Sequence, residues 1–108
     1  MMNVQNSKLR SEIIPVEIDF GNRMVGSETP QTVASAISVH AGLDPSPASM
    51  LVGAPTLSGT YATQVLDEGL PGVIYEVTIS VRTSANNIYI SESLVAVLSD
   101  NAAVPPGL

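Results

Sequence analysis

The amino-acid sequence predicts an all-β protein, a sandwich of two antiparallel sheets. Three observations lead to this prediction. Apolar and polar residues alternate in several short stretches, turn residues separate these stretches, and no stretch shows the 3.6-residue periodicity of a capped helix. The 108 residues are enough for one domain with a single hydrophobic core.

The clearest strand is predicted over residues 73–83. One of its faces is apolar and the other is polar, so we expect the apolar face to be buried. The apolar face holds Val73, Tyr75, Val77, Ile79 and Val81, and the other holds Glu76, Thr78, Ser80 and Arg82. After a turn at 84–87, a return strand is predicted over 88–98. Its residues 94–98 are all apolar, which predicts that both faces are covered there.

Three weaker alternations predict further strands. They are the runs Ile14, Val16, Ile18 and Phe20; Val33, Ile37 and Val39; and Tyr61, Thr63 and Val65. The segment between residues 41 and 59 holds three prolines and three glycines, so we expect only one short strand there, over 49–52. Six or seven short strands in one domain are typical of a β-sandwich.

The two ends of the chain are expected to be flexible. We predict an N-terminal arm over residues 1–12, a sandwich domain over 13–98 and a C-terminal tail over 99–108, whose Pro-Pro-Gly sequence cannot join a ladder. The arm carries Lys8 and Arg10, whereas residues 11–108 hold two arginines and ten acids, a net charge of 2 − 10 = −8. We therefore predict Lys8, Leu9 and Arg10 as contacts to an acidic partner surface, ordered only on assembly. The alternative is a solvated arm that contacts no partner.

The composition argues against several classes of protein. There is no cysteine and one histidine, so thiolate and multi-histidine metal sites are excluded. The net charge of −6 argues against binding nucleic acid, and no stretch is apolar enough for a membrane span or signal peptide. His40 is expected on the surface, and Asp67-Glu68 in a solvated turn. We expect no enzyme, no catalytic residue, no metal and no cofactor.

A motif at residues 70–79 resembles the approach to the sixth strand of fibronectin type III domains. A leucine, Pro71-Gly72 and Tyr75 precede alternating valine and isoleucine. The resemblance implies a fibronectin type III-like, or immunoglobulin-like, antiparallel β-sandwich. It also implies that Tyr75 is buried with its hydroxyl bonded to upstream backbone between residues 63 and 70, in a tyrosine corner that Pro71 and Gly72 shape. The alternative is a tyrosine that simply packs in the core.

A wider pattern resembles small immunoglobulin-like virion structural proteins of tailed bacteriophages. It comprises a polar arm, the sequence IPVEIDF at 14–20, a middle rich in proline and glycine, SGTYATQV at 58–65, PGVIY at 71–75 and a last hairpin. This resemblance implies a virion component made in the host cytoplasm, with capsid or other virion proteins and further copies of itself as partners. The predicted role is a capsid decoration or cement protein. The alternative is a tail, fibre or head–tail junction component that recognises the host surface, although few aromatic residues are available to stack on sugars.

Overall fold

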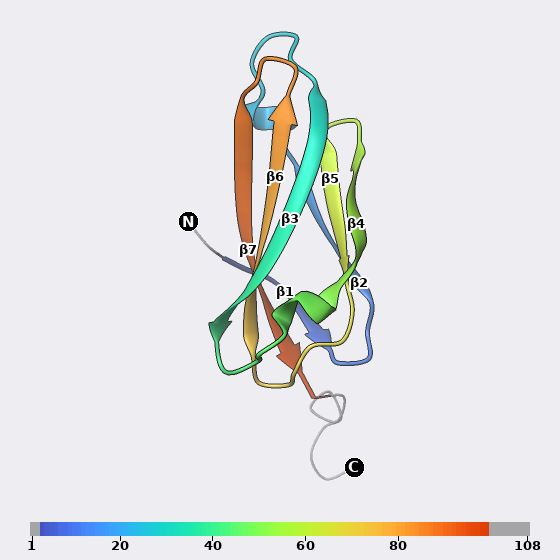
Figure 1. Cartoon of the computed structure of the whole chain (residues 1–108), viewed down its shortest axis with the longest axis vertical. Helices are drawn as coiled ribbons and strands as arrows, with labels where there is room; N and C mark the ends of the chain where they lie inside the picture. Colours follow the sequence, from blue (N-terminus) through green and yellow to red (C-terminus); the bar gives the residue numbers. More distant parts are fainter. Residues whose placement is uncertain (1–2, 100–108) are drawn as a thin grey trace.

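The computed structural model describes residues 3–99, which form two β-sheets packed face to face (Figure 1). The strands of the described residues are β1 (Asn3–Leu9), β2 (Ile14–Asp19), β3 (Pro30–Ala41), β4 (Leu51–Ser58), β5 (Tyr61–Leu66), β6 (Ile74–Thr83) and β7 (Ile88–Leu98). Two short 3-10 helices, η1 (Gly21–Arg23) and η2 (Pro47–Met50), lie in the connections. The predicted all-β sandwich is confirmed.

Sheet I has the strand order β1-β7-β6-β3, and sheet II has the order β2-β5-β4. All neighbouring strands are antiparallel except β1, which runs parallel to β7. The chain crosses from one sheet to the other between β1 and β2, between β2 and β3, between β3 and β4, and between β5 and β6. These crossings place β3 and β4 side by side along one edge of the sandwich, at the front of Figure 1.

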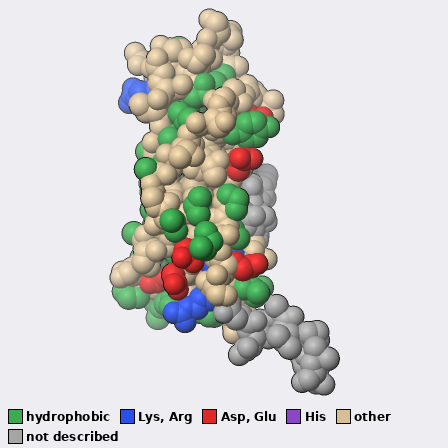
Figure 2. Space-filling view, turned by 90° about the vertical axis from the view of Figure 1, so that its right-hand side faces the viewer, with side chains coloured by type: hydrophobic (Ala, Val, Ile, Leu, Met, Phe, Trp, Pro, Cys, Tyr) green, Lys and Arg blue, Asp and Glu red, His purple; other side chains and the backbone are tan. Residues whose placement is uncertain are grey.

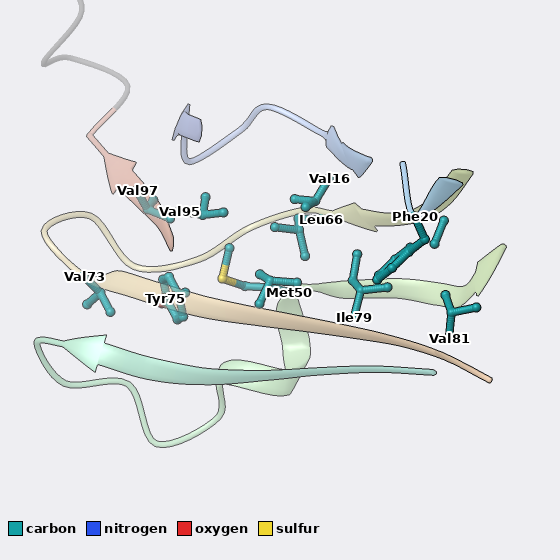
Figure 3. Close-up of a cluster of buried hydrophobic side chains, with 12 residues drawn as sticks. Val16, Phe20, Met50, Leu66, Val73, Tyr75, Ile79, Val81, Val95 and Val97 are labelled. Carbon is teal, nitrogen blue, oxygen red and sulfur yellow. The ribbon is translucent and has the colours of Figure 1, made fainter. Parts of the chain in front are cut away.

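The hydrophobic core lies between the two sheets (Figure 3). Strand β6 supplies its centre, with Tyr75, Val77, Ile79 and Val81 almost inaccessible to solvent. Sheet II, its connections and β7 cover these side chains, principally through Val16, Phe20, Met50, Ala62, Leu66, Val95 and Val97. The predicted apolar face of residues 73–83 is therefore the buried face, as the alternation requires.

Strand β7 is only partly covered on both faces. Val95 and Val97 point into the core, and Leu94 on the opposite face is 8% exposed. Leu98, in contrast, is 42% exposed. The prediction of two covered faces is thus correct for the start of the run and wrong at its end.

Strand β5 turns its predicted apolar run outward. Tyr61 is exposed and Val65 half-buried, whereas Ala62, Gln64 and Leu66 are fully buried. The buried amide of Gln64 is satisfied, because its oxygen accepts a bond from the Ser35 hydroxyl at 2.6 Å and its nitrogen donates to backbone carbonyls, one of them that of Val65 at 2.9 Å. A polar residue can occupy a core position when every polar atom has a partner.

Strand β4 is longer than the predicted strand at 49–52 and begins two residues later. It continues to Ser58 through Gly53 and Pro55, and its pairing with β5 is interrupted between Val52 and Thr56. The prediction failed because β4 is an edge strand. At an edge, an irregularity can place a proline where no ladder hydrogen bond is needed.

The predicted N-terminal arm is wrong for its described part. Residues 3–9 form β1, which pairs with β7 from Asn3 opposite Ser93 to Leu9 opposite Leu98. A strand joins the sheet here because β7 would otherwise leave this half of its edge unpaired. The predicted tail lies outside the described residues except for Ser99.

Candidate interaction surface

The outer face of sheet I is formed by aligned residues of β3, β6 and β7, and three of these are charged, Arg82, Glu76 and Glu92. The odd-numbered residues of β3, β6 and β7 point into the sandwich, so the even-numbered ones form this outer face. Aligned residues of the three strands form four rows across it. The rows are Thr32–Arg82–Ile88, Ala34–Ser80–Ile90, Ala36–Thr78–Glu92 and Ser38–Glu76–Leu94.

Two exposed isoleucines mark the end of this face nearest the β6–β7 hairpin. Ile88 is 53% exposed and Ile90 is 54% exposed. Beside them is a hollow of about 310 Å³, lined by Thr32, Val33, Ala34, Ser80, Arg82 and Ile88. These two neighbouring apolar side chains and the hollow that Arg82 helps to line make this end of the face the candidate interaction surface.

The carboxylate of Glu28 fixes the hairpin that carries this patch. It accepts hydrogen bonds from the Thr83 hydroxyl, from Asn87 Nδ2 at 3.0 Å, from the Tyr89 hydroxyl at 2.8 Å and from the Val25 backbone N–H at 2.6 Å. These bonds, that of Thr83 foremost, lower the pKa of Glu28 to about 2. Glu28 is therefore ionised at neutral pH and ties the η1–β3 connection to the hairpin.

Arg23 fixes the free part of the β7 edge. Its guanidinium lies 5.5 Å from the centre of the Phe20 ring and donates to the carbonyl of Ile90 at 2.5 Å. Strand β1 pairs with β7 only from Ser93 onward, so among residues 3–99 no strand covers this carbonyl. The position of Ile90 is thus held by η1 as well as by β6.

Lys8 lies inside the protein and not on its surface. Its side chain is 1% exposed, and its ammonium donates to the carbonyls of Leu9, Arg10 and Glu68 at 2.7–2.9 Å. Lys8 is therefore wrong as a predicted partner contact, because a buried ammonium bonded to three carbonyls is not available to another protein. Leu9 is half-buried, and Arg10 lies near Glu68 with 3.8 Å between Nε and Oε2.

Tyr75 connects three segments at the opposite end of the sandwich from the hairpin. It is fully buried, and its hydroxyl accepts a bond from the Leu70 backbone N–H at 2.9 Å. This is the upstream backbone bond that the sequence motif predicts. The hydroxyl also donates to Asp44 Oδ2 at 2.7 Å, and burial together with this bond raises the pKa of Tyr75. Pro71 and Gly72 form the exposed turn between Leu70 and β6, where Gly72 has a φ of 86°.

The remaining predicted positions show no clustered chemistry in the described part of the chain. His40 is exposed near the end of β3, and Asp67 and Glu68 follow β5 in a connection. Within residues 3–99, no three histidine or acidic side chains come together as a metal site, and no helix has the length and apolar character that crossing a bilayer requires.

Comparison with known protein families identifies a family that matches the chain. A sequence model of the family described as podophage GP4 fiber-tail adaptor protein gp77 matches residues 8–96, nearly the whole sandwich. The chain belongs to this family. No curated protein matches the chain in sequence.

Membership of the fiber-tail adaptor family makes the chain a bacteriophage structural protein and a component of the virion, as the sequence predicts. The predicted role as a capsid decoration protein is not supported. The family description favours the alternative, a tail or fibre component. The sequence could not separate the two roles, because its composition, charge and strand pattern do not identify which virion protein the surface contacts.

Two structurally important residues of this adaptor-family chain escaped the sequence analysis. Glu28 lies in a polar connection without periodicity, and Gln64 lies between the outward residues of β5. The one signal for Gln64 was its position in an alternating strand, where one of the two faces must be buried. No pattern in the sequence indicated that Glu28 gathers four donors.

Proposed function

We propose that this chain is an adaptor in a podophage virion, joining tail and fibre through protein–protein contacts and without catalysis. The observation that carries the proposal is the family match over residues 8–96. The structure supports it with a domain whose two ends are each cross-linked by hydrogen bonds, at Glu28 and at Tyr75.

The outer face of sheet I is the docking surface in this proposal. Its end near the hairpin offers Ile88 and Ile90, half exposed, next to the hollow that Arg82 helps to line. The face of sheet II is the alternative surface (Figure 2), and it also carries hydrophobic side chains. The large hydrophobic side chains exposed there, Val52 at 43% and Tyr61 at 45%, are less exposed than the two isoleucines of sheet I, at 53% and 54%.

We also propose that the sandwich is immunoglobulin-like. The order of β7, β6 and β3 in sheet I and of β2, β5 and β4 in sheet II matches the G-F-C and B-E-D arrangement of immunoglobulin constant-type domains. The hydrogen bond of Tyr75 supports the same proposal, since a tyrosine corner is a hallmark of this architecture. Strand β1 differs in pairing with β7 instead of joining the strands of sheet II.

A complementation experiment tests the docking surface. Phage lacking this gene is grown in cells supplying wild-type protein, Ile90→Glu or Val52→Glu, and fibre content is measured by quantitative mass spectrometry of purified particles. Val52 is the matched control, because it is 43% exposed on β4 of sheet II. We expect Ile90→Glu to lower fibre content at least fivefold and Val52→Glu to leave it unchanged.

Two outcomes would contradict the proposal. Full fibre content on particles that lack the protein altogether would contradict the adaptor role. Equal fibre content with Ile90→Glu and with wild-type protein would contradict the assignment of the surface. If those particles also failed to adsorb to host cells, recognition of the host surface would be the better account.

A further inference from the structure

Strand β3 is an edge strand with an open backbone. Within residues 3–99 it pairs only with β6, and β4, which contacts it, hydrogen-bonds to β5 instead. Its twelve residues include no lysine, arginine, aspartate or glutamate, and its one proline is the first residue. A long uncharged edge readily pairs with another strand, so proteins normally guard or cover such an edge.

The edges of sheet II are guarded, in contrast. Strand β2 carries Pro15, Glu17 and Asp19, and β4 contains Gly53 and Pro55 within an interrupted ladder. Proline, charge and irregularity are the usual devices against strand addition. Their concentration on sheet II and their absence from the middle of β3 indicate that the β3 edge is kept open for a partner strand.

The charges flanking β3 identify a partner of the same sequence. On the outer face, Thr32 aligns with Arg82 at one end of β3, and Ser38 aligns with Glu76 at the other. An antiparallel copy of β3 would bring each positive end against a negative end. The charges beside this edge are therefore complementary to those of a second copy, although the chain has a net charge of −6.

We propose that two copies of this chain pair through antiparallel β3 strands about a two-fold axis at Ser35. The register places Thr32 opposite Ser38 of the second copy, Val33 opposite Ile37 and Ala34 opposite Ala36. Arg82 of one copy and Glu76 of the other then share a row, three strand spacings or about 14 Å apart at the backbone. Only Thr32 and Ser38 separate them, and both are small enough for the two long side chains to approach each other above them.

The inner face of β3 fits the same register. Val33, Ile37 and Val39 point into the sandwich but remain half-buried at the open edge. Pairing Val33 with Ile37 of the second copy would cover these side chains with apolar surface. Because an axis perpendicular to the sheet relates the copies, both outer faces of sheet I would lie on the same side of one eight-stranded sheet. The dimer would therefore present its two isoleucine patches on the same side of the sheet, one on each β7, separated by five strand spacings or about 24 Å across the sheet.

Charge reversal tests the pairing. The dissociation constant is measured by analytical ultracentrifugation for wild type, Arg82→Glu, Glu76→Arg and the double reversal. We expect each single reversal to weaken dimerisation at least tenfold and the double reversal to restore it to within threefold of wild type. Circular dichroism confirms that each variant is folded.

A second pair of variants separates edge pairing from face-to-face docking. Ala36 and Thr78 are aligned neighbours on the outer face, but only Ala36 is on the edge strand. We expect Ala36→Lys to weaken the dimer at least tenfold, because two lysines would meet beside the axis. Thr78→Lys should leave it intact. Equal loss with both variants would contradict edge pairing in favour of face-to-face docking.

Engineered cysteines test the register, since the chain has no cysteine of its own. An oxidised mixture of Ala34→Cys and Ala36→Cys proteins should give the mixed disulfide dimer and little of either homodimer. Efficient homodimers of Ala36→Cys would contradict the proposed register. A wild-type protein that stays monomeric up to 200 μM, or a dimer insensitive to all the charge reversals, would overturn the proposal.

Discussion

Replacing Tyr75 by phenylalanine removes a single oxygen that holds two other segments in place. Without it, the Leu70 N–H loses its acceptor and the Asp44 carboxylate loses its donor. A neutral hydrogen bond contributes about 1 kcal/mol and one to a charged group about 1.5–3 kcal/mol, the lower value applying because Asp44 is half-exposed. We therefore expect Tyr75→Phe to lower the free energy of unfolding by about 2–3 kcal/mol, whereas the sequence motif alone, with one backbone bond, predicts about 1 kcal/mol.

Urea denaturation followed by circular dichroism measures this loss. With an m-value of about 1.5 kcal/mol/M, the midpoint should fall by about 1–2 M while m stays constant. Tyr61→Phe is the matched control, because Tyr61 is 45% exposed, and its stability should stay within about 0.5 kcal/mol of wild type. Equal midpoints for the two variants would refute the reasoning. A double-mutant cycle with Asp44→Asn isolates the charged bond, and a coupling near zero would show that Asp44 contributes nothing.

Three further predictions concern the ends of the sandwich and are checked by the same unfolding measurement. Lys8→Met should lower the free energy of unfolding by about 1–3 kcal/mol, because it removes the three hydrogen bonds that the ammonium donates. Arg10→Met is the control and should lower it by less than about 1 kcal/mol. Equal effects of the two variants would contradict the buried role of Lys8. Gly69→Ala should lower the free energy of unfolding clearly more than Gly72→Ala. Both glycines have a positive φ, but a Cβ at position 69 would lie 2.8 Å from a valine methyl, whereas a Cβ at position 72 would meet no atom within 4 Å. Glu28→Gln should lower the free energy of unfolding above pH 4.5, because the pKa of Glu28 is depressed in the folded state. The difference in unfolding free energy between this variant and wild type should vanish as the pH falls toward 2. A difference that stays constant from pH 7 to 2 would contradict this account.

The sequence predicted correctly those strands in which burial alone determines the alternation of apolar and polar residues. Strand β6 lies in the interior of sheet I, so its alternation reads directly as core and surface. Edge strands do not obey this logic. Pro55 in β4 and the polar residues of β1 look like loop residues until a neighbouring strand supplies the pairing.

The candidate surface could be predicted only in part. The outward position of Arg82 follows from the alternation of β6, but its alignment with Thr32 and Ile88 depends on the register of three strands. Lys8 was misplaced for a related reason. A lysine in a polar segment normally lies in solvent, and its burial depends on the carbonyl of Glu68, sixty residues away in the chain.

The position of the protein on the particle tests the adaptor role most directly. Gold-labelled antibody against this chain can be applied to intact virions, and head and tail fractions of dissociated particles can be quantified by mass spectrometry. We predict that the label is confined to the tail, where fibres attach. The amount of this protein should be highest in the tail fraction and proportional to the amount of the other tail proteins. Label spread over the head, with a copy number that follows the capsid protein, would contradict the adaptor role and restore that of a capsid decoration protein.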